Sequence, residues 1–493
     1  MINPAYMTDE GYRKYRQSLL LVFMAAVNRL YPQARIDVHQ SVNRSTYVEF
    51  KNMRITRRRT EEIKSKMREL INSGFKLETF EATKEEASRL MADTNPELSE
   101  KIIYTPRRCV RLFEDSGRFY SVYGEVVEST AYLSEFDVMP FETGLLLRYP
   151  HPGYNGEIPP FTWGKKIIQT INDYRAWNEI TGISDVFELN RAIRNGNAAN
   201  IINIAEIIHE KAVSEIADEI KNEILHKKLI VIAGPSSSGK TTFANRLMLH
   251  LRANGITPEV ISLDDYFLDS DKSPLDEDGK PDFETPESLD ITLFSEHMEA
   301  LTEGESVDVP KYDFIRGKRS EVTRKLQLKP SSVVIIEGLH ALNERLLLGV
   351  RSDYIYKVYC SALTSLRFDN VNPISPTDTR LLRRIIRDNS FRNTSAEKTI
   401  DMWSSVTRGE VKYIFPYENR ADVIFNSSNI YEWSLYRSAA EPLLSEALAK
   451  DGAHREKCKS LLELLSYFEP TDARYVPPMS IMREFIGGSS ISY

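Results

Sequence analysis

The stretch GPSSSGKT, residues 234–241 near the middle of the 493-residue chain, constrains the fold more than any other. It fills every position of the pattern G-x-x-x-x-G-K-[ST]. The preceding run Leu229–Ala233 is apolar and rich in β-branched residues, and Phe243, Leu247 and Leu251 follow at helical spacing. A glycine-serine turn that binds no phosphate would need neither an apolar strand before it nor a helix after it. The sequence therefore predicts a buried strand, a phosphate-binding loop and a helix.

The residue types in this loop suit the phosphates of a nucleotide. Gly234 and Gly239 permit backbone angles that a Cβ would forbid, so successive N–H groups can surround a phosphate. The following helix adds the positive end of its dipole. Lys240 is placed to reach the β- and γ-phosphates, and the Thr241 hydroxyl is placed to bind Mg²⁺. The expected nucleotide-binding residues of the loop are Gly234, Pro235, Ser236, Ser237, Ser238, Gly239, Lys240, Thr241 and Thr242.

Charge and cysteine content argue against several classes of protein. The formal net charge of -7 gives no overall attraction to nucleic acid or to an anionic membrane. Cys109, Cys360 and Cys458 are scattered and form no C-x-x-C pair, which argues against a disulfide framework and a zinc site. The apolar run Leu19–Val27 is far shorter than a membrane span. We interpret it as part of a helix, with a signal peptide as the alternative, and expect a cytoplasmic protein.

The patterns divide the chain into four predicted parts. Residues 1–150 mix helical and strand-like periods and predict an α+β domain, and residues 151–226 predict a linker and a helical segment that begin in a Pro- and Gly-rich stretch. Residues 227–435 predict an α/β domain, with a parallel sheet flanked by helices. Residues 436–493 predict a helical C-terminal region that ends in a polar tail.

Three carboxylates follow predicted core strands. Asp264 and Asp265 come after EVIS, and Glu337 ends SVVIIE. In an open α/β sheet the carboxyl ends of the strands face the ligand crevice, so these side chains should lie beside the phosphate loop. A carboxylate there can accept the proton of an attacking hydroxyl or bind Mg²⁺. We predict Asp264 as the base and Thr241, Asp264 and Glu337 as the metal site; a solvated aspartate pair is the alternative.

Two polar stretches suit the acceptor side of such a site. Residues 269–290 are rich in Pro, Asp and Glu, which predicts a mobile lid. Residues 311–320, KYDFIRGKRS, combine the aromatic pair Tyr312 and Phe314 with Arg316 and two further cations. The aromatic faces could stack a base while the cations meet phosphate. A basic surface hairpin is the alternative interpretation.

Four arginines share one face of a predicted helix in TDTRLLRRIIRDNSFRN. Their spacing of i, i+3, i+4 and i+7 places them together, with leucines and isoleucines largely opposite. Like charges at this spacing repel one another unless an anion lies against them, and a nucleotide polyphosphate is the natural candidate. An amphipathic helix with a solvated basic face is the alternative. The four residues are Arg380, Arg383, Arg384 and Arg387.

Residues from about 227 to 428 resemble the uridine kinase and phosphoribulokinase family. The motifs that carry the resemblance occur in order: GPSSSGKTT, SLDDYF, DFETPESLD, VPKYDF, VVIIEGLHAL, DTRLLRRIIRD and ADVIFNS. The resemblance implies phosphorylation of a nucleoside 5′-hydroxyl, with ATP and Mg²⁺ as cofactors. It implies Asp264 as the base, Lys240 and Thr241 at the donor phosphates, and Glu337 in the magnesium shell. It also implies an arginine lid of Arg380, Arg383 and Arg387, and an acceptor site at Glu284 and Tyr312, to which we add Arg316.

Two departures from the family pattern concern the acceptor. Gly317 stands where the nucleoside kinases have a base-contacting histidine in Y-D-F-x-x-H. Residues 363–376, LTSLRFDNVNPISP, are an insertion relative to the short uridine kinases. The acceptor is therefore less closely defined than the donor.

The N-terminal part resembles the second N-terminal domain of threonyl-tRNA synthetases. The likeness is carried by YRQSLLLVFMAAVNRLYPQARID, RRRTEEIKSKMRELINSGF with its ATKEEASRL continuation, and ESTAYLSEFDV. In the synthetases this domain hydrolyses mischarged tRNA with an H-x-x-x-H pair and a cysteine-histidine pair. Here Gln17, Leu21, Val122 and Val126 stand at those positions. The resemblance therefore implies a scaffold or binding role without the editing chemistry.

We predict a kinase of uridine or cytidine that serves pyrimidine salvage. A kinase of a sugar phosphate or polyol is the first alternative, and an NTP-dependent RNA-binding regulator is the second. A guanine-specific switch would need N-K-x-D, and the nearest match, NRAD at residues 419–422, lacks the lysine. We expect a small-molecule nucleoside as partner, no membrane, and nucleic acid only through the N-terminal domain. A homo-oligomer and the choice between ATP and GTP are left open.

Overall fold

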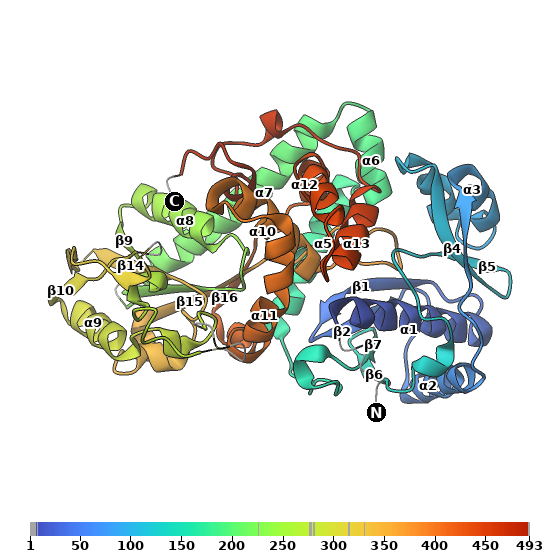
Figure 1. The fold of residues 1–493 in the computed structure, drawn as a ribbon, viewed down its shortest axis with the longest axis horizontal. Helices are drawn as coiled ribbons and strands as arrows, with labels where there is room; N and C mark the ends of the chain where they lie inside the picture. The colour runs from blue at the N-terminus through green and yellow to red at the C-terminus, as the bar shows by residue number, and fades with distance from the viewer. Residues whose placement is uncertain are drawn as a thin grey trace. The chain divides into compact units, whose positions relative to one another are not determined.

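The computed structural model describes residues 6, 8–224, 226–275, 279, 282–313, 316–329 and 331–491 (Figure 1). The chain forms two compact units, each made of three segments. Unit 1 comprises Met1–Ile201, Thr364–Asp401 and Asn429–Ala473, and unit 2 comprises Ile202–Leu363, Met402–Ser428 and Arg474–Tyr493. Each of the four parts predicted from the sequence is one continuous stretch, whereas each of these units combines three separate segments. The predicted domain boundaries therefore remain a prediction.

Unit 2 is built on a five-stranded parallel sheet, as the sequence predicts. The strand order is β16-β15-β8-β14-β9. Strand β8 lies at the centre, and every one of its residues is buried, which is why it reads as an unbroken apolar run. The strands are β8 (Leu229–Ala233), β9 (Thr257–Ser262), β14 (Ser332–Glu337), β15 (Ile355–Ser361) and β16 (Val423–Asn426).

Helices flank this sheet. Helix α8 (Lys240–Ala253) packs on β8, β9 and β14 through the buried Phe243, Leu247 and Leu251. Helix α7 (Ala198–Asn222), most of which belongs to unit 2, contacts β15 through a hydrogen bond from Tyr356 to Glu219. The other helices of unit 2 are α9 (Ile291–Glu303), the part of α11 (Ala396–Tyr413) from Met402 onward, α14 (Arg483–Ile486) and short 3-10 turns, η5 (Leu263–Tyr266) among them.

Two small antiparallel pairs complete unit 2. Strand β10 (Ser306–Val309) pairs with β13 (Arg324–Gln327), and β11 (Tyr312–Asp313) pairs with β12 (Lys318–Arg319). The second pair is a hairpin, as the alternative interpretation of KYDFIRGKRS proposes. Phe314, the second member of the predicted aromatic pair, lies outside the described residues, as do several residues of the predicted lid, at 276–278 and 280–281.

The N-terminal part of unit 1 has the predicted α+β composition. Helices α1 (Asp9–Leu30) and α2 (Arg57–Asn72) pack together, and their apolar residues join one buried core with residues of the β1-β2-β7-β6 sheet. A second sheet has the order β3-β4-β5. The strands are β1 (Ile36–Val42), β2 (Ser45–Phe50), β3 (Thr79–Thr83), β4 (Cys109–Asp115), β5 (Arg118–Ser121), β6 (Asp137–Phe141) and β7 (Gly144–Arg148).

A threonine side chain caps the start of one helix in this region. The Thr83 hydroxyl accepts a hydrogen bond from Glu86 N–H at 3.2 Å and begins α3 (Lys84–Met91). The remaining helices of unit 1 are α4 (Pro96–Lys101), α5 (Lys165–Thr181), α6 (Val186–Arg194), α10 (Pro376–Arg392), α12 (Glu432–Leu448) and α13 (Arg455–Leu465), together with the first residues of α7 and α11.

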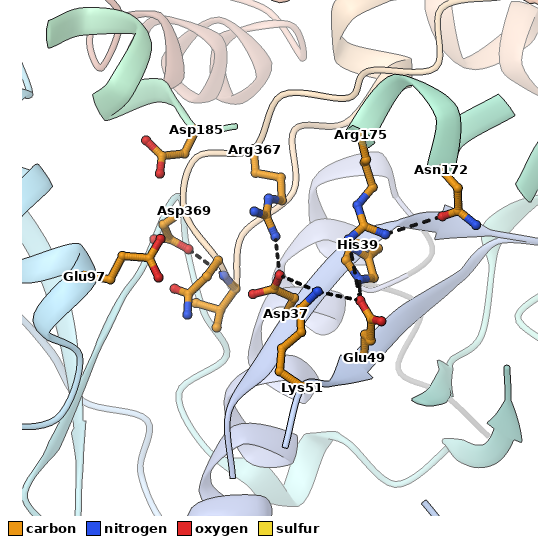
Figure 2. Close-up of polar contacts among 12 residues, drawn as sticks. Asp37, His39, Glu49, Lys51, Glu97, Asn172, Arg175, Asp185, Arg367 and Asp369 are labelled. Atoms are coloured by element: carbon orange, nitrogen blue, oxygen red, sulfur yellow. Dashed lines mark hydrogen bonds and ion pairs between the residues drawn. The ribbon is translucent and has the colours of Figure 1, made fainter. Parts of the chain in front are cut away.

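Within unit 1, the inserted residues 364–376 bind the N-terminal part. Figure 2 shows Arg367 directed at Asp37 of β1, beside a chain of charges in which Lys51 bridges Asp37 and Glu49. Four contacts of the insertion are Arg367 with Asp37 (3.3 Å), Tyr123 Oη with Asp369 (3.0 Å), Asn372 Nδ2 with Ser121 O (3.1 Å) and Val38 N with Asn370 O (2.8 Å). The insertion is therefore a structural connection between the N-terminal part and α10.

Candidate active site

The loop after β8 has the backbone that its sequence predicts. Gly239 has φ of +85°, and Ser237 also has positive φ, at 58°. Gly234 is required for a different reason, because a Cβ there would lie 1.9 Å from the carbonyl oxygen of Cys360 on β15. The close approach of β15 thus excludes a side chain at position 234.

Lys240 lies over this loop. Its Nζ donates hydrogen bonds to the carbonyl oxygens of Gly234 and Pro235 at 2.9 and 3.0 Å. The ammonium group is thereby held at the mouth of the loop, at the first residue of α8. A phosphate bound by the loop amides would meet this charge directly.

Glu337 lies between the phosphate loop and Asp264. It ends β14, where it is in register with Ile232 of β8 on one side and Ser262 of β9 on the other. The Ser262 hydroxyl donates to Glu337 Oε1 at 3.1 Å and accepts from Asp264 N–H at 3.3 Å. The three parallel strands thus bring two predicted carboxylates together, as the sequence argument from strand ends expects.

The electrostatics of Glu337 reflect this crowding. Burial raises the pKa of Glu337 to about 7, the Asp264 carboxylate acts in the same direction, and Lys240 opposes both. Glu484, from the far end of the chain, also raises it. The site therefore holds more negative charge than Lys240 neutralises.

These residues suit a magnesium ion. Oxygen donors are the ligands that Mg²⁺ prefers, and it usually keeps waters and phosphate oxygens beside one or two carboxylates. Asp264, Glu337 and the Thr241 hydroxyl supply such a partial set at the end of the sheet. In the described part of the chain no group of three or more His, Cys, Asp or Glu side chains is arranged to hold a metal. The partial set of oxygen donors fits a Mg²⁺ ion whose remaining ligands come from nucleotide phosphates and water.

The predicted acceptor residues surround the segment after β9. Tyr312 is buried, with its ring against Phe267 at 5.7 Å between centroids, and its N–H donates to Asp265 Oδ1 at 3.3 Å. Asp265 also pairs with Lys311 at 3.1 Å. Asp265 is therefore occupied by structural contacts, which separates its environment from that of Asp264.

Glu284 and Arg316 differ in how enclosed they are. Glu284 is half-buried and lies under Gly409 of α11, where an added Cβ would come within 2.6 Å of the Glu284 Cβ. The Arg316 side chain is 83% exposed and pairs with Asp313 at 3.6 Å. Arg316 thus has the solvated setting of a surface hairpin, and nothing in its contacts distinguishes it as a ligand-binding group.

The structure explains why a glycine stands at position 317. Its φ is +63°, and an added Cβ would lie 2.4 Å from the Ser270 hydroxyl. Ser270 N and Oγ both donate to Gly317 O, at 2.9 and 3.0 Å, and Ser270 Oγ also contacts the Tyr312 hydroxyl. The residue that replaces the family histidine therefore joins the β11–β12 hairpin to the predicted lid.

Carboxylates of unit 1 pair with Arg383, Arg384 and Arg387 on the arginine face of α10. Arg383 is fully buried and pairs with Glu432 of α12 at 2.8 Å, and Arg380 is buried as well. Arg384 and Arg387 both contact Asp388, at 3.3 and 3.1 Å. The sequence expects an anion against this face, and protein carboxylates supply part of that negative charge. The lid assignments of Arg380, Arg383 and Arg387 stay a prediction.

Two glutamates that the sequence argument missed contact the phosphate loop. The buried Glu410 of α11 accepts a hydrogen bond from Ser236 N–H at 2.9 Å. Glu484 accepts from Thr242 N–H at 3.3 Å and from the Thr242 hydroxyl at 2.6 Å. No local pattern marks Glu410, whereas the apolar spacing of Ile481, Met482 and Phe485 is a signal that the tail near Glu484 packs.

The four positions that the synthetase resemblance aligns with editing residues lie in or beside the unit 1 core. Leu21 and Val122 are buried, and Val126 packs against the same cluster. Gln17 Nε2 donates to Asn372 Oδ1 of the insertion at 3.0 Å and lines a cavity of about 60 Å³. Ligand pockets are commonly 300–1,000 Å³, so this cavity holds a few waters rather than a nucleotide.

The fold and the site together define a class of protein. A parallel sheet leads from its central strand into a phosphate loop, with a lysine and two carboxylates at neighbouring strand ends. This is a P-loop phosphotransferase. None of the helices described is long and apolar enough to cross a membrane.

Comparisons with known proteins identify the family. The phosphoribulokinase/uridine kinase family matches residues 229–432. A uridine kinase of Staphylococcus aureus (strain JH9) is 32% identical over 197 residues, which are 40% of this chain and 86% of the relative. The chain belongs to the phosphoribulokinase/uridine kinase family and is an ATP-dependent kinase.

Two solved structures are similar to part of this chain. A possible uridine kinase from Bacillus stearothermophilus is 23% identical, with 43% of this chain and 97% of that chain covered, at a TM-score of 0.24. A D-glycerate 3-kinase from Cryptococcus neoformans var. grubii is 16% identical, with 56% and 88% covered, also at a TM-score of 0.24. At these scores neither likeness bears on the acceptor.

Proposed function

We propose that this kinase transfers the γ-phosphoryl group of ATP to the 5′-hydroxyl of a nucleoside, uridine or cytidine. The observation that carries the proposal is that Ser262 links Asp264 and Glu337 at neighbouring strand ends, in a region of 197 residues that is 32% identical to a uridine kinase. The loop amides and Lys240 hold the donor phosphates. Thr241, Asp264 and Glu337 would hold Mg²⁺, which would neutralise negative charge on the phosphates.

The reaction needs few groups from the protein. The acceptor oxygen forms a bond to the γ-phosphorus while the bond from that phosphorus to the β,γ-bridging oxygen breaks, and ADP leaves with the electron pair. The proton of the acceptor hydroxyl passes to the Asp264 carboxylate. Lys240 stabilises negative charge on the β- and γ-phosphates. A lid role for Arg380, Arg383 and Arg387 rests on the family resemblance alone, and the buried pair of Arg383 with Glu432 does not favour it. Glu284, Tyr312 and Arg316 contact the nucleoside.

The acceptor assignment has one specific rival. Gly317 replaces the base-contacting histidine of the nucleoside kinases and is built into the hairpin by Ser270. A site without that histidine could take a sugar phosphate or a polyol instead. The regulator hypothesis has less support, because the nearest match to N-K-x-D, NRAD at residues 419–422, lacks the lysine.

We also propose that the N-terminal part is a scaffold derived from a synthetase-like editing domain. Its support is the burial of Leu21 and Val122 in the core and the attachment of the insertion to its strands. In this role residues 1–150 hold α10 through the insertion.

One acceptor screen tests the main proposal. Purified protein is given ATP and Mg²⁺ with each of uridine, cytidine, other nucleosides, sugar phosphates and polyols, and ADP release is measured. Uridine or cytidine should stimulate release, and Lys240→Ala should abolish it. Stimulation by a sugar phosphate or polyol alone would replace the nucleoside assignment, and ATP hydrolysis only with tRNA present would favour the regulator.

A further inference from the structure

The C-terminal tail, residues 474–491, is a packed element of unit 2. Ile481, Met482 and Phe485 are fully buried. The Ser480 hydroxyl donates to Glu206 of α7 at 2.7 Å, and Arg483 donates to the carbonyl oxygens of Val476 and Gly487, which closes the turn. The sequence predicts that residues 436–493 end in a polar tail, and Ile481, Met482 and Phe485 are apolar residues near that end which enter the core of unit 2.

Two tail residues contact the start of the phosphate-loop helix. Ile481 lies against Gly239, where an added Cβ would come within 2.7 Å of Ile481 Cγ2. Glu484 accepts hydrogen bonds from the N–H and the hydroxyl of Thr242. The two tail residues are three apart, and so are the two loop residues. Ile481 and Glu484, on one face of the tail turn, thus contact Gly239 and Thr242 at the start of α8.

These contacts lie at the first turn of α8, where the phosphate loop passes into the helix and its geometry affects phosphate binding. Thr242 is the third residue of α8, so its N–H has no partner within the helix. A carboxylate at a helix N-terminus is favoured by the dipole, and hydrogen bonds to an ionised acceptor are short and strong. Thr242 is buried and Glu484 is only 9% exposed, so solvent does not weaken this interaction as it would at the surface.

We propose that the C-terminal tail is part of the nucleotide-binding site and that Glu484 is a positioning residue. By fixing Thr242, Glu484 sets the rotation of the first turn of α8 and thereby the direction of the loop amides and of the Thr241 hydroxyl. The tail lies outside residues 229–432, which match the family, so this support is added to the kinase by the C-terminal extension. The inference rests on the proposed function in naming ATP as the ligand.

The test compares three variants by the Kd for ATP from titration calorimetry and by KM and kcat. Glu484→Ala removes both hydrogen bonds, and we expect the Kd and KM for ATP to rise on the order of tenfold while the acceptor KM changes little. Glu484→Gln keeps an acceptor oxygen and should stay within about threefold of wild type. Glu305→Ala, at an exposed glutamate of the same unit, is the matched control and should bind as wild type.

A variant at Thr242 tests the same contact from the α8 side. Thr242→Val removes the hydroxyl donor, and in the double variant with Glu484→Ala the losses should be clearly less than additive. Additive losses, or a wild-type Kd in Glu484→Ala, overturn the inference. So does tighter ATP binding by Glu484→Gln, because the carboxylate would then oppose the nucleotide. The Kd requires no acceptor, so a wrong acceptor leaves this test intact, and wild-type protein that binds no ATP overturns both proposals.

Discussion

The Arg383 guanidinium and the Glu432 carboxylate form a fully buried ion pair. Nη2 and Nε of Arg383 lie 2.8 and 2.9 Å from Glu432 Oε2, and the two side chains are 0% and 1% exposed. The pair joins α10 to α12 inside unit 1. Compared with apolar residues of the same size, a buried ion pair adds little to the free energy of unfolding. Removal of one partner is costly, because the charge of the other is then buried without compensation.

Glu432→Gln should therefore destabilise the protein by about 3 kcal/mol, because the buried Arg383 guanidinium loses the negative charge of the Glu432 carboxylate. Chemical denaturation at pH 7 measures the change. Glu456→Gln is the control, since Glu456 pairs with Lys459 on the surface with the two side chains 64% and 54% exposed, and its loss should cost less than about 1 kcal/mol. Equal losses in the two variants would show that the Arg383 pair is not what stabilises this helix contact.

Asp264→Asn should lower kcat on the order of a hundredfold or more, because the amide cannot take the acceptor proton. The KM for ATP should change far less. Asp265→Asn is the matched control: its carboxylate contacts Lys311 and Tyr312 N–H, so we expect its effect to fall on stability or acceptor KM. A larger loss of kcat in Asp265→Asn than in Asp264→Asn would reverse the assignment.

Gly317→Ala should raise the acceptor KM on the order of tenfold and leave the KM for ATP nearly unchanged. The new Cβ meets the Ser270 hydroxyl and the backbone has positive φ, so the hairpin that carries Tyr312 must shift. Gly304→Ala separates the steric clash from the backbone strain. Gly304 also has positive φ, +86°, but no atom of the described residues lies within 4 Å of the position of an added Cβ. Similar kinetics in both variants would attribute the effect to backbone strain alone.

His340, three residues after Glu337, should make unit 2 sensitive to acid. Burial lowers the pKa of His340 to about 4, and Lys240 acts in the same direction, while the Glu284 backbone and Glu287 oppose it. In the unfolded chain the imidazole titrates near pH 6.5. Below pH 6.5 the unfolded state therefore binds a proton that the folded state does not, so stability falls as the pH falls from 6.5 toward 4.

The expected loss from this one group between pH 7 and pH 5 is on the order of 2 kcal/mol. His340→Gln does not titrate, so its free energy of unfolding should fall by that much less over the same interval. Chemical denaturation of both proteins at the two pH values gives the comparison. Parallel pH profiles would mean that the His340 side chain is accessible to protons in the folded state.

The sequence determined the local and periodic features of this protein. The apolar run before GPSSSGKT, the glycines of the loop and the helical spacing after it are contiguous, so strand, loop and helix follow from neighbouring residues. The placement of Asp264 and Glu337 followed from one general rule, that parallel strands end at the same edge of a sheet. The ordered motifs then indicated the family.

Only the tertiary structure decided which polar groups meet across long stretches of chain. Helical spacing put four arginines on one face, but it could not show that Arg383 is buried against Glu432. Glu484 meets Thr242 from 242 residues away, and no local pattern encodes such a partner. The reason is physical: periodicity reports which face of an element is apolar, whereas the cost of burying a charge is met by whichever opposite charge the packing brings beside it.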